Sequence, residues 1–397
     1  MSPLKVGVGA SSGADSRQAG QAAARQALAG CAGLPPAGAV VFSGYHGLDH
    51  GELLAGVREV LGHTPLVGGT TFGEIAGPEL SEGSVVVWLL AGRAVRAAVG
   101  LGTGVAKDAF AAGAQAAKAA LRCLPEKPKL FLIFYETQMG DPDRAVEGAK
   151  SVLGRDFPIV GAGTGSGLMM EQNPFSKQFC GGEVLGGCFA GLLLGGDFAF
   201  SCGFSHGGTA VSKEFVLTKT RDNVVVELDG RPALDVFEET LGIKLGARGL
   251  GYLDIQLAVQ EPRHPGLDTI RALWGADVKQ RTLYCGNVID EGLRVKLSQV
   301  RADVTLQRQK AAMAKARAQL GGPVAGTLCI DCYGRKLTLG AQQLIGTELR
   351  LIFEAAGKGP LAGLYSGSEC VVLDWGGKDP ESRYCHQSTS FVLFGES

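Results

Sequence analysis

The sequence lacks the features that mark several large classes of protein. Lys and Arg total 38 against 39 Asp and Glu, so the basic excess that nucleic-acid binders use to displace counterions is missing. The N-terminal stretch MSPLKVGVGASSGAD has no basic segment followed by a long apolar run, as a secretory signal would. The most apolar stretch, residues 184–196, is too short and too rich in glycine for a membrane-spanning helix. We therefore expect a soluble cytoplasmic protein that binds neither nucleic acid nor membrane.

Complete catalytic and metal-binding motifs are missing as well. The sequence contains no GxxxxGK[ST] phosphate loop, no HExxH and no GxSxG nucleophile elbow. Cys329 and Cys332 form a CxxC, but no second CxxC accompanies it to complete a zinc site. The pair lies in a predicted strand, where residues three apart point to opposite faces. We expect reduced thiols and no metal, with one of the two cysteines facing a pocket at the strand end.

Glycine, by contrast, is abundant. The chain has 61 glycines in 397 residues, about twice the usual share. They are spread among Val, Ile, Leu and Phe, which is typical of neither a linker nor a collagen. This distribution predicts many tight turns and many close approaches of one backbone segment to another.

A glycine-rich block occurs three times. Each block begins with Pro, then Leu or Ile, then Val or Ala, then Gly, and each has a hydroxyl residue in seventh place. The blocks are PLVGGTTFGE at 65–74, PIVGAGTGSG at 158–167 and PLAGLYSGSE at 360–369. Short glycine-rich strings also match by chance, but the similar flanks of these three favour a duplication.

The flanks of the blocks repeat in the same order. An apolar run and a helix-like stretch precede each block, and a second apolar run follows it. The first runs are 39–43, 130–135 and 327–332; the helical stretches are 53–61, 143–153 and 341–355; the second runs are 84–90, 183–194 and 388–394. This order predicts an α/β protein of repeated strand, helix, glycine-rich segment and strand, with mixed sheets covered by helices.

Two domains are expected from this organisation. The first, 1–204, holds two repeats, and the second, 205–397, holds the third repeat at 325–397. The segment from 205 to 300 differs from the repeats. It contains NVVVEL, then Asp229-Gly230, then a helical pattern, which predicts a strand, a tight turn and a helix.

Several polar residues at the ends of predicted strands are candidates for a site. Glu74 and Glu369 close two of the blocks, where a carboxylate binds a ligand amine, orders a loop or is simply solvated. His386 stands just before the last apolar run, although a lone histidine is more often a hydrogen-bonded structural residue. His46 and His50 flank a predicted loop, and we interpret them as solvated rather than as a metal pair.

These segments resemble the FIST family. Residues 65–90, with a glycine-rich segment that ends in Gly-Glu before a strand, resemble the N-terminal FIST domain. The stretch DCYGR at 331–335 is similar to the Cys-x-Gly-Arg of the C-terminal FIST domain. The block at 360–369 is similar to its Pro-Leu-x-Gly-Phe-Tyr-x-x-Gly-Glu, and HQST at 386–389 to its His-Asn-x-Thr. Two departures are Ser368 in place of the last Gly and Gln387 in place of Asn.

The resemblance implies a bacterial sensory protein that binds a small ligand, either an amino-acid-like metabolite or haem, and signals through a separate partner. It places a site at Cys332, Arg335, Glu369 and His386, with Glu74 in a related N-terminal site. Arg335 would pair with a ligand carboxylate and Glu369 with an amine, while Cys332 and His386 supply further contacts. In a haem-binding version, His386 is the first choice of axial ligand.

Two other functions stay open at this point. The first is an enzyme with Cys332 as nucleophile, His386 as base and Glu369 as the group that orients the base. The second is a scaffold whose repeats fold but bind no ligand.

Overall fold

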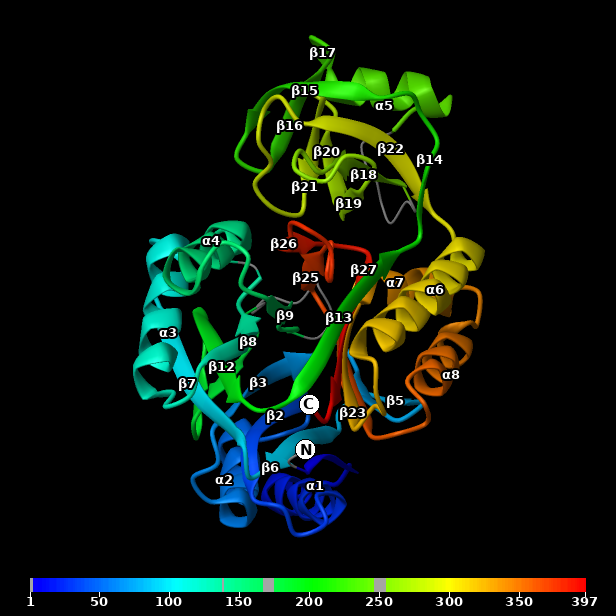
Figure 1. Ribbon diagram of the computed structural model, residues 1–397. Coiled ribbons are helices and arrows are strands. Elements are labelled where there is room, and N and C mark those ends of the chain that lie inside the picture. The colour runs from blue at the N-terminus through cyan, green and yellow to red at the C-terminus, as the bar shows by residue number, and fades with distance from the viewer. Residues whose placement is uncertain (1–2, 138, 167–174, 246–254) are drawn as a thin grey trace.

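Three similar units and one inserted domain make up the protein. The computed structural model describes residues 3–137, 139–166, 175–245 and 255–397. Helices α1 and α2 cover the first unit, α3 and α4 the second, and α6 and α8 the third, while the inserted domain lies beyond one end of β13 (Figure 1).

Each unit runs through the same series of elements. The first unit consists of β1 (Leu4–Ser11), α1 (Ser16–Gly30), β2 (Pro36–Gly44), α2 (His50–Leu61), β3 (Leu66–Thr71), a hairpin of β4 (Glu74–Ala76) and β5 (Glu79–Ser81), and β6 (Val85–Gly92). The second consists of β7 (Val95–Thr103), α3 (Ala109–Cys123), β8 (Pro128–Tyr135), α4 (Pro142–Leu153), β9 (Ile159–Gly163), a hairpin of β10 (Gln178–Cys180) and β11 (Glu183–Leu185), and β12 (Cys188–Gly196).

The third unit is interrupted after its first strand. It consists of β13 (Ala199–His206) and then α6 (Ala302–Leu320), β23 (Gly326–Cys332), α7 (Tyr333–Gly340), α8 (Ile345–Ala355), β24 (Leu361–Ser366), a hairpin of β25 (Ser368–Leu373) and β26 (Glu381–Cys385), and β27 (Ser388–Gly395). The division expected between residues 204 and 205 falls within β13, which pairs with β27.

The inserted domain has its own sheet and its own apolar core. Its elements are β14 (Gly208–Ala210), β15 (Phe215–Arg221), β16 (Val224–Leu228), β17 (Arg231–Pro232), α5 (Ala233–Leu241), β18 (Ile255–Gln260), β19 (Asp268–Arg271), β20 (Leu273–Asp277), β21 (Thr282–Cys285) and β22 (Arg294–Val300). The strand, turn and helix predicted from residue 223 onward correspond to β16, the turn at Asp229 and α5.

The three units exchange their hairpins in a closed ring. Within each unit the strand order is first, last, second, third, and only the second and third strands run parallel. The hairpin that follows the third strand then joins a neighbouring unit. β4 pairs with β24, β10 pairs with β3, and β25 pairs with β9. Each sheet is therefore completed by a segment from another unit, which fixes the three units relative to one another.

The interior has a common core and three outer layers. Trp88, Phe134 and Phe394, one from each unit, lie in the apolar cluster where the three sheets meet. On the outer faces, small and branched residues of the helices pack on each sheet separately. The first four helices begin at an aspartate whose carboxylate accepts a hydrogen bond from a backbone N–H in the first turn, which satisfies one otherwise unpaired donor; these residues are Asp15, Asp49, Asp108 and Asp141.

The predicted fold class of repeated units with mixed sheets under helices is confirmed. Two predicted elements differ in detail. The run 183–194 is divided into β11 and β12 by a turn in which Gly187 has a φ of 64°. The helix expected at 341–355 is α8, which begins at Ile345, and α7 is a further short helix before it. The last residue of the second block lies outside the described residues, and no described helix is long and apolar enough to span a membrane.

The glycine in fourth place of each block has one physical cause in all three units. A Cβ atom on Gly68, Gly161 or Gly363 would lie 1.9, 2.1 or 2.1 Å from a carbonyl oxygen of the adjacent parallel strand. No side chain larger than hydrogen fits at that distance. The glycine recurs in the sequence block because the same close contact between strands occurs in each unit.

Replacing Gly363 with alanine should lower the free energy of unfolding by about 1–3 kcal/mol, the usual cost of overpacking. The new Cβ would meet the backbone oxygen of Cys329, which has no freedom to move within the sheet. Gly322→Ala is the matched control, since its Cβ would meet nothing within 4 Å. Urea unfolding of both variants checks this, and equal stability of the two would contradict it.

Candidate functional site

A buried polar group closes the hairpin of each unit. In the first unit, Thr71 Oγ1 donates to Glu74 Oε1, while the backbone N–H and the hydroxyl of Ser84 donate to Glu74 Oε2 at 2.9 and 2.8 Å. Glu74 is fully buried, and burial raises the pKa of its carboxyl group. Glu74 thus ties the end of β3 to the start of β6.

The third unit has the same arrangement around Glu369. Glu369 Oε1 lies 2.7 Å from Ser366 Oγ, and Glu369 Oε2 accepts from the N–H and the hydroxyl of Ser388 at 3.2 and 2.8 Å. Burial raises the pKa of this carboxyl group to about 8. Glu369 is therefore placed as Glu74 is, with a hydroxyl before it and a serine after it.

The second unit uses an amide in the equivalent place. Gln178 Nε2 donates to Thr164 Oγ1 at 2.7 Å, and Gln178 Oε1 accepts from the N–H of Cys188 at 3.2 Å. The hydroxyl residues in seventh place of the three blocks are thus equivalent in the structure. Each is hydrogen-bonded to the buried Glu or Gln side chain of its own unit.

Arg335 lies at the start of α7 and is completely buried. Its Nε donates to Asp331 Oδ1 at 2.8 Å, and its Nη2 donates to Glu348 Oε1. Burial raises the pKa of the Glu348 carboxyl group, and the charge of Arg335 opposes this rise. The guanidinium group therefore faces two acidic side chains of its own unit and holds α7 against β23 and α8.

His386 is buried against the inserted domain. Its Nδ1 accepts from the N–H of Ala272 at 3.4 Å, and its Nε2 lies 3.3 Å from the hydroxyl of Tyr384. Burial, together with the charge of Arg271, lowers the pKa of the imidazole to about 3, so the ring is neutral. Axial ligation of haem by either nitrogen would displace one of these two contacts.

Cys332 ends β23 and is buried as well. The N–H of Gln387 donates to its Sγ at 3.2 Å. Burial, and next the neighbouring Glu369, raise the pKa of this thiol well above its usual value, whereas an activated nucleophile has a lowered pKa. Among the described residues, no three His, Cys, Asp or Glu side chains gather closely enough to hold a metal ion.

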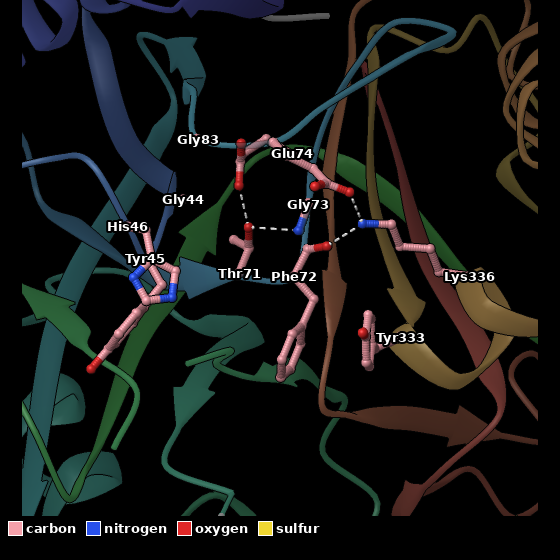
Figure 2. A pocket seen from close by; sticks show the side chains of 11 residues that line it. Gly44, Tyr45, His46, Thr71, Phe72, Gly73, Glu74, Gly83, Tyr333 and Lys336 are labelled. Carbon is pink, nitrogen blue, oxygen red and sulfur yellow. Dashed lines mark hydrogen bonds and ion pairs between the residues drawn. The ribbon is translucent and has the colours of Figure 1, made fainter. Parts of the chain in front are cut away.

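An open pocket lies where the first unit meets the third. It has a volume of about 360 Å³. Its walls come from the ends of β2 and β3, from the turn before β6 and from the start of α7 (Figure 2). The lining residues are Gly44, Tyr45, His46, Thr71, Phe72, Gly73, Glu74, Glu82, Gly83, Tyr333 and Lys336. Of the five residues predicted for a site, Glu74 lines this pocket.

A nearly buried cation lies at one side of the pocket. The side chain of Lys336 is 11% exposed, and its Nζ donates to the carbonyl of Phe72 at 2.6 Å and to Glu82 at 2.5 Å. The same Nζ lies 5.9 Å from the ring centre of Tyr333 and 5.6 Å from that of Tyr365. Glu82 is 71% exposed, so one partner of this ion pair is in solvent and the other is in the protein.

Aromatic rings form two walls. Phe72 and Tyr333 stack with ring centres 4.4 Å apart and planes at 20°, although they come from different units. Tyr45 and His46 pack edge to face at 4.9 Å. The two pairs lie on opposite sides of Thr71 in Figure 2. The space between them offers flat apolar surfaces next to one positive charge.

Sequence reasoning missed most of these residues. Lys336 directly follows Arg335, and Phe72 lies within the first block, two residues before Glu74. Both are therefore close in sequence to residues predicted for the site. His46 was interpreted as part of a solvated loop, and it lies at the exposed rim of the pocket. The signal that was available is their place after the carboxyl ends of parallel strands, where ligands of α/β sheets bind.

Comparisons with known proteins identify the family. A model of the FIST N domain matches residues 37–231, and a model of the FIST C domain matches residues 233–371. FIST domains are associated with sensory and signal-transduction proteins and bind small ligands.

Similar proteins occur in bacteria and archaea. An uncharacterized protein of Mycobacterium tuberculosis is 27% identical over 381 residues, which cover 92% of this chain and 94% of the relative. An uncharacterized protein of Methanocaldococcus jannaschii is 26% identical over 202 residues, 48% of this chain and 38% of the relative. Among solved structures, a cyanuric acid hydrolase matches over 99% of this chain and 100% of its own, with 9% identity and a TM-score of 0.35.

Proposed function

Since the chain belongs to the FIST family, we propose that it is a sensory protein that binds a small metabolite of amino-acid size in the pocket between the first and third units. The observation that carries this proposal is the pocket itself: an open cavity at the carboxyl ends of parallel strands, with aromatic walls and a nearly buried Lys336.

The size and polarity of the pocket support a ligand of this kind. A volume of about 360 Å³ is at the lower end of the range for small-molecule sites. Mostly apolar walls with a few polar groups are typical of sites that orient a metabolite. His386, the candidate haem ligand, is not among the lining residues, so the pocket favours a metabolite over haem.

Other predicted residues act behind the pocket wall in this proposal. Arg335, held by Asp331 and Glu348, fixes the first turn of α7 and thereby presents Tyr333 and Lys336 to the ligand. Glu74 fixes the hairpin of β4 and β5, which belongs to the first unit by sequence and to the sheet of the third by pairing. A ligand at the base of this hairpin would contact both units. We propose that the ligand changes the position of the hairpin and that a separate partner protein recognises this change.

Thermal unfolding in the presence of the common amino acids and related metabolites tests the proposal. A ligand that binds only the native state must raise the unfolding temperature. We expect at least one metabolite to stabilise the protein, and Tyr333→Ala to lose that stabilisation because the stacked wall is broken. Tyr284→Ala is the matched control, since Tyr284 also stacks on an aromatic ring, Trp274, in the inserted domain. No stabilising metabolite, or equal stabilisation of Tyr333→Ala, would overturn the proposal.

A further inference from the structure

We infer that the pocket takes an aryl carboxylate, a planar ring bearing a carboxylate group, and that the carboxylate of Glu82 occupies the anion position on Lys336 until the ligand displaces it. This inference rests on the proposed ligand site and names its ligand class.

Lys336 supplies the charge that selects an anion. Its ammonium group is nearly buried and lies at the edge of the cavity, with Phe72 and Glu82 as acceptors. A buried cation needs an anionic partner, because an unpaired charge is costly away from water. The carbonyl of Phe72 is fixed in the backbone, so Glu82 is the partner that can leave.

Glu82 is suited to be displaced. Its side chain is 71% exposed and stands in the turn that precedes β6. When it leaves Lys336 it returns to water, and exposed partners of ion pairs gain little from pairing. A ligand carboxylate in the same place would be held by the surrounding rings as well as by the ammonium group. Exchange of one carboxylate for another leaves the charge of the site unchanged.

The other acidic group of the pocket does not offer a site for a cation. Both carboxylate oxygens of Glu74 already accept hydrogen bonds from Thr71 and Ser84. Burial also raises the pKa of the Glu74 carboxyl group, which favours its neutral form. Lys336 is thus the charged group of the lining whose partner can be exchanged for a ligand.

The aromatic walls select the rest of the ligand. Phe72 with Tyr333 and Tyr45 with His46 present ring surfaces on two sides of the cavity (Figure 2). A planar ring packs on such surfaces in offset or edge-to-face geometry better than a branched aliphatic group. A ring between the walls, with its carboxylate towards Lys336, uses both features at once.

Calorimetric titration with benzoate and phenylacetate, and with neutral benzamide for comparison, tests the inference on the full chain. We expect an aryl carboxylate to bind at least tenfold more tightly than benzamide. Glu82→Gln should tighten its binding by about threefold or more, because the competing carboxylate is gone, and Lys336→Met should weaken it at least tenfold. Glu79→Gln, an exposed change on the same hairpin, is the matched control and should leave affinity unchanged.

The outcomes separate this inference from the proposed function. Equal binding of benzamide and benzoate, or weaker binding to Glu82→Gln, would overturn the exchange at Lys336. If a neutral or cationic metabolite binds and is lost in Tyr333→Ala, while no aryl carboxylate binds, the ligand class is wrong and the ligand site stands. If no metabolite of any class binds, the proposed function fails together with the inference. Because Glu82 is exposed, its variant reports on binding even if Lys336→Met does not fold.

Discussion

An Arg335→Met variant is expected to lose about 3–5 kcal/mol of the free energy of unfolding, the usual cost of removing one partner of a buried ion pair. Arg335 is completely buried, and its guanidinium group pairs with Asp331 and Glu348, which are also buried. Methionine fills much of the same space but leaves the Asp331 carboxylate without its cation. Urea unfolding followed by circular dichroism measures the loss.

The same variant separates two roles for Arg335. Arg350→Met is the matched control, because Arg350 lies on the exposed face of α8, and it should change stability by less than about 0.5 kcal/mol. If Arg335→Met were as stable as this control and lost only ligand affinity, Arg335 would contact the ligand directly. Its assignment as the residue that positions α7 would then be wrong.

The second large effect concerns Glu369 and pH. Ser366 Oγ lies 2.9 Å from the carbonyl of Asp331 and 2.7 Å from Glu369 Oε1, and a hydroxyl has one proton to donate. In the second unit the equivalent Thr164 donates to the carbonyl of Tyr135 and accepts from the amide of Gln178. By analogy, we expect Glu369 to carry a proton and to donate it to Ser366. This agrees with the raised pKa of about 8.

The sign of the pH dependence follows from that proton. The pKa of Glu369 is about 8 in the folded state, against 4.5 for an ordinary glutamate, so between these values the folded state holds one more proton than the unfolded state. The contribution of Glu369 to the free energy of unfolding is therefore fully present below pH 4.5. It is lost as pH rises through 8, by about 1.4 kcal/mol per pH unit.

Glu369→Gln should remove this loss, because the amide reproduces the hydrogen bonds of Gln178 and has no proton to release. We therefore expect the variant to gain stability relative to the unmodified protein as pH rises from 5 to 8. Glu354→Gln, an exposed change on α8, serves as the control. Urea unfolding at several pH values measures the difference, and a difference that stays constant with pH would contradict a protonated Glu369.

Much of the fold could be predicted because its causes are local. The Pro-x-x-Gly blocks exist because a glycine must meet a neighbouring strand at three equivalent places, so the repeat was visible in the sequence. The exchange of hairpins could not be predicted. β4 and β10 are three residues long, too short for a periodic pattern, and their partners β24 and β3 are far away in the sequence.

The candidate site was predicted less well than the fold, for a related reason. Residue type and spacing drew attention to Arg335 and His386, but type does not show whether a polar side chain is satisfied inside the protein. Asp331, four residues before Arg335, and Ala272, in the inserted domain, take up the polar atoms that a ligand was expected to use. The pocket depends on Lys336 meeting Glu82, and these residues are 254 positions apart.

We expect a small ligand to bind between the first and third units. A crystal structure of the protein with the metabolite that stabilises it most in thermal unfolding tests this most directly. The expected result is ligand density between the Tyr45–His46 and Phe72–Tyr333 walls, with an anionic group of the ligand in contact with Lys336 Nζ and Glu82 turned away. Density at Cys332 and His386 instead, with this pocket empty, would contradict it.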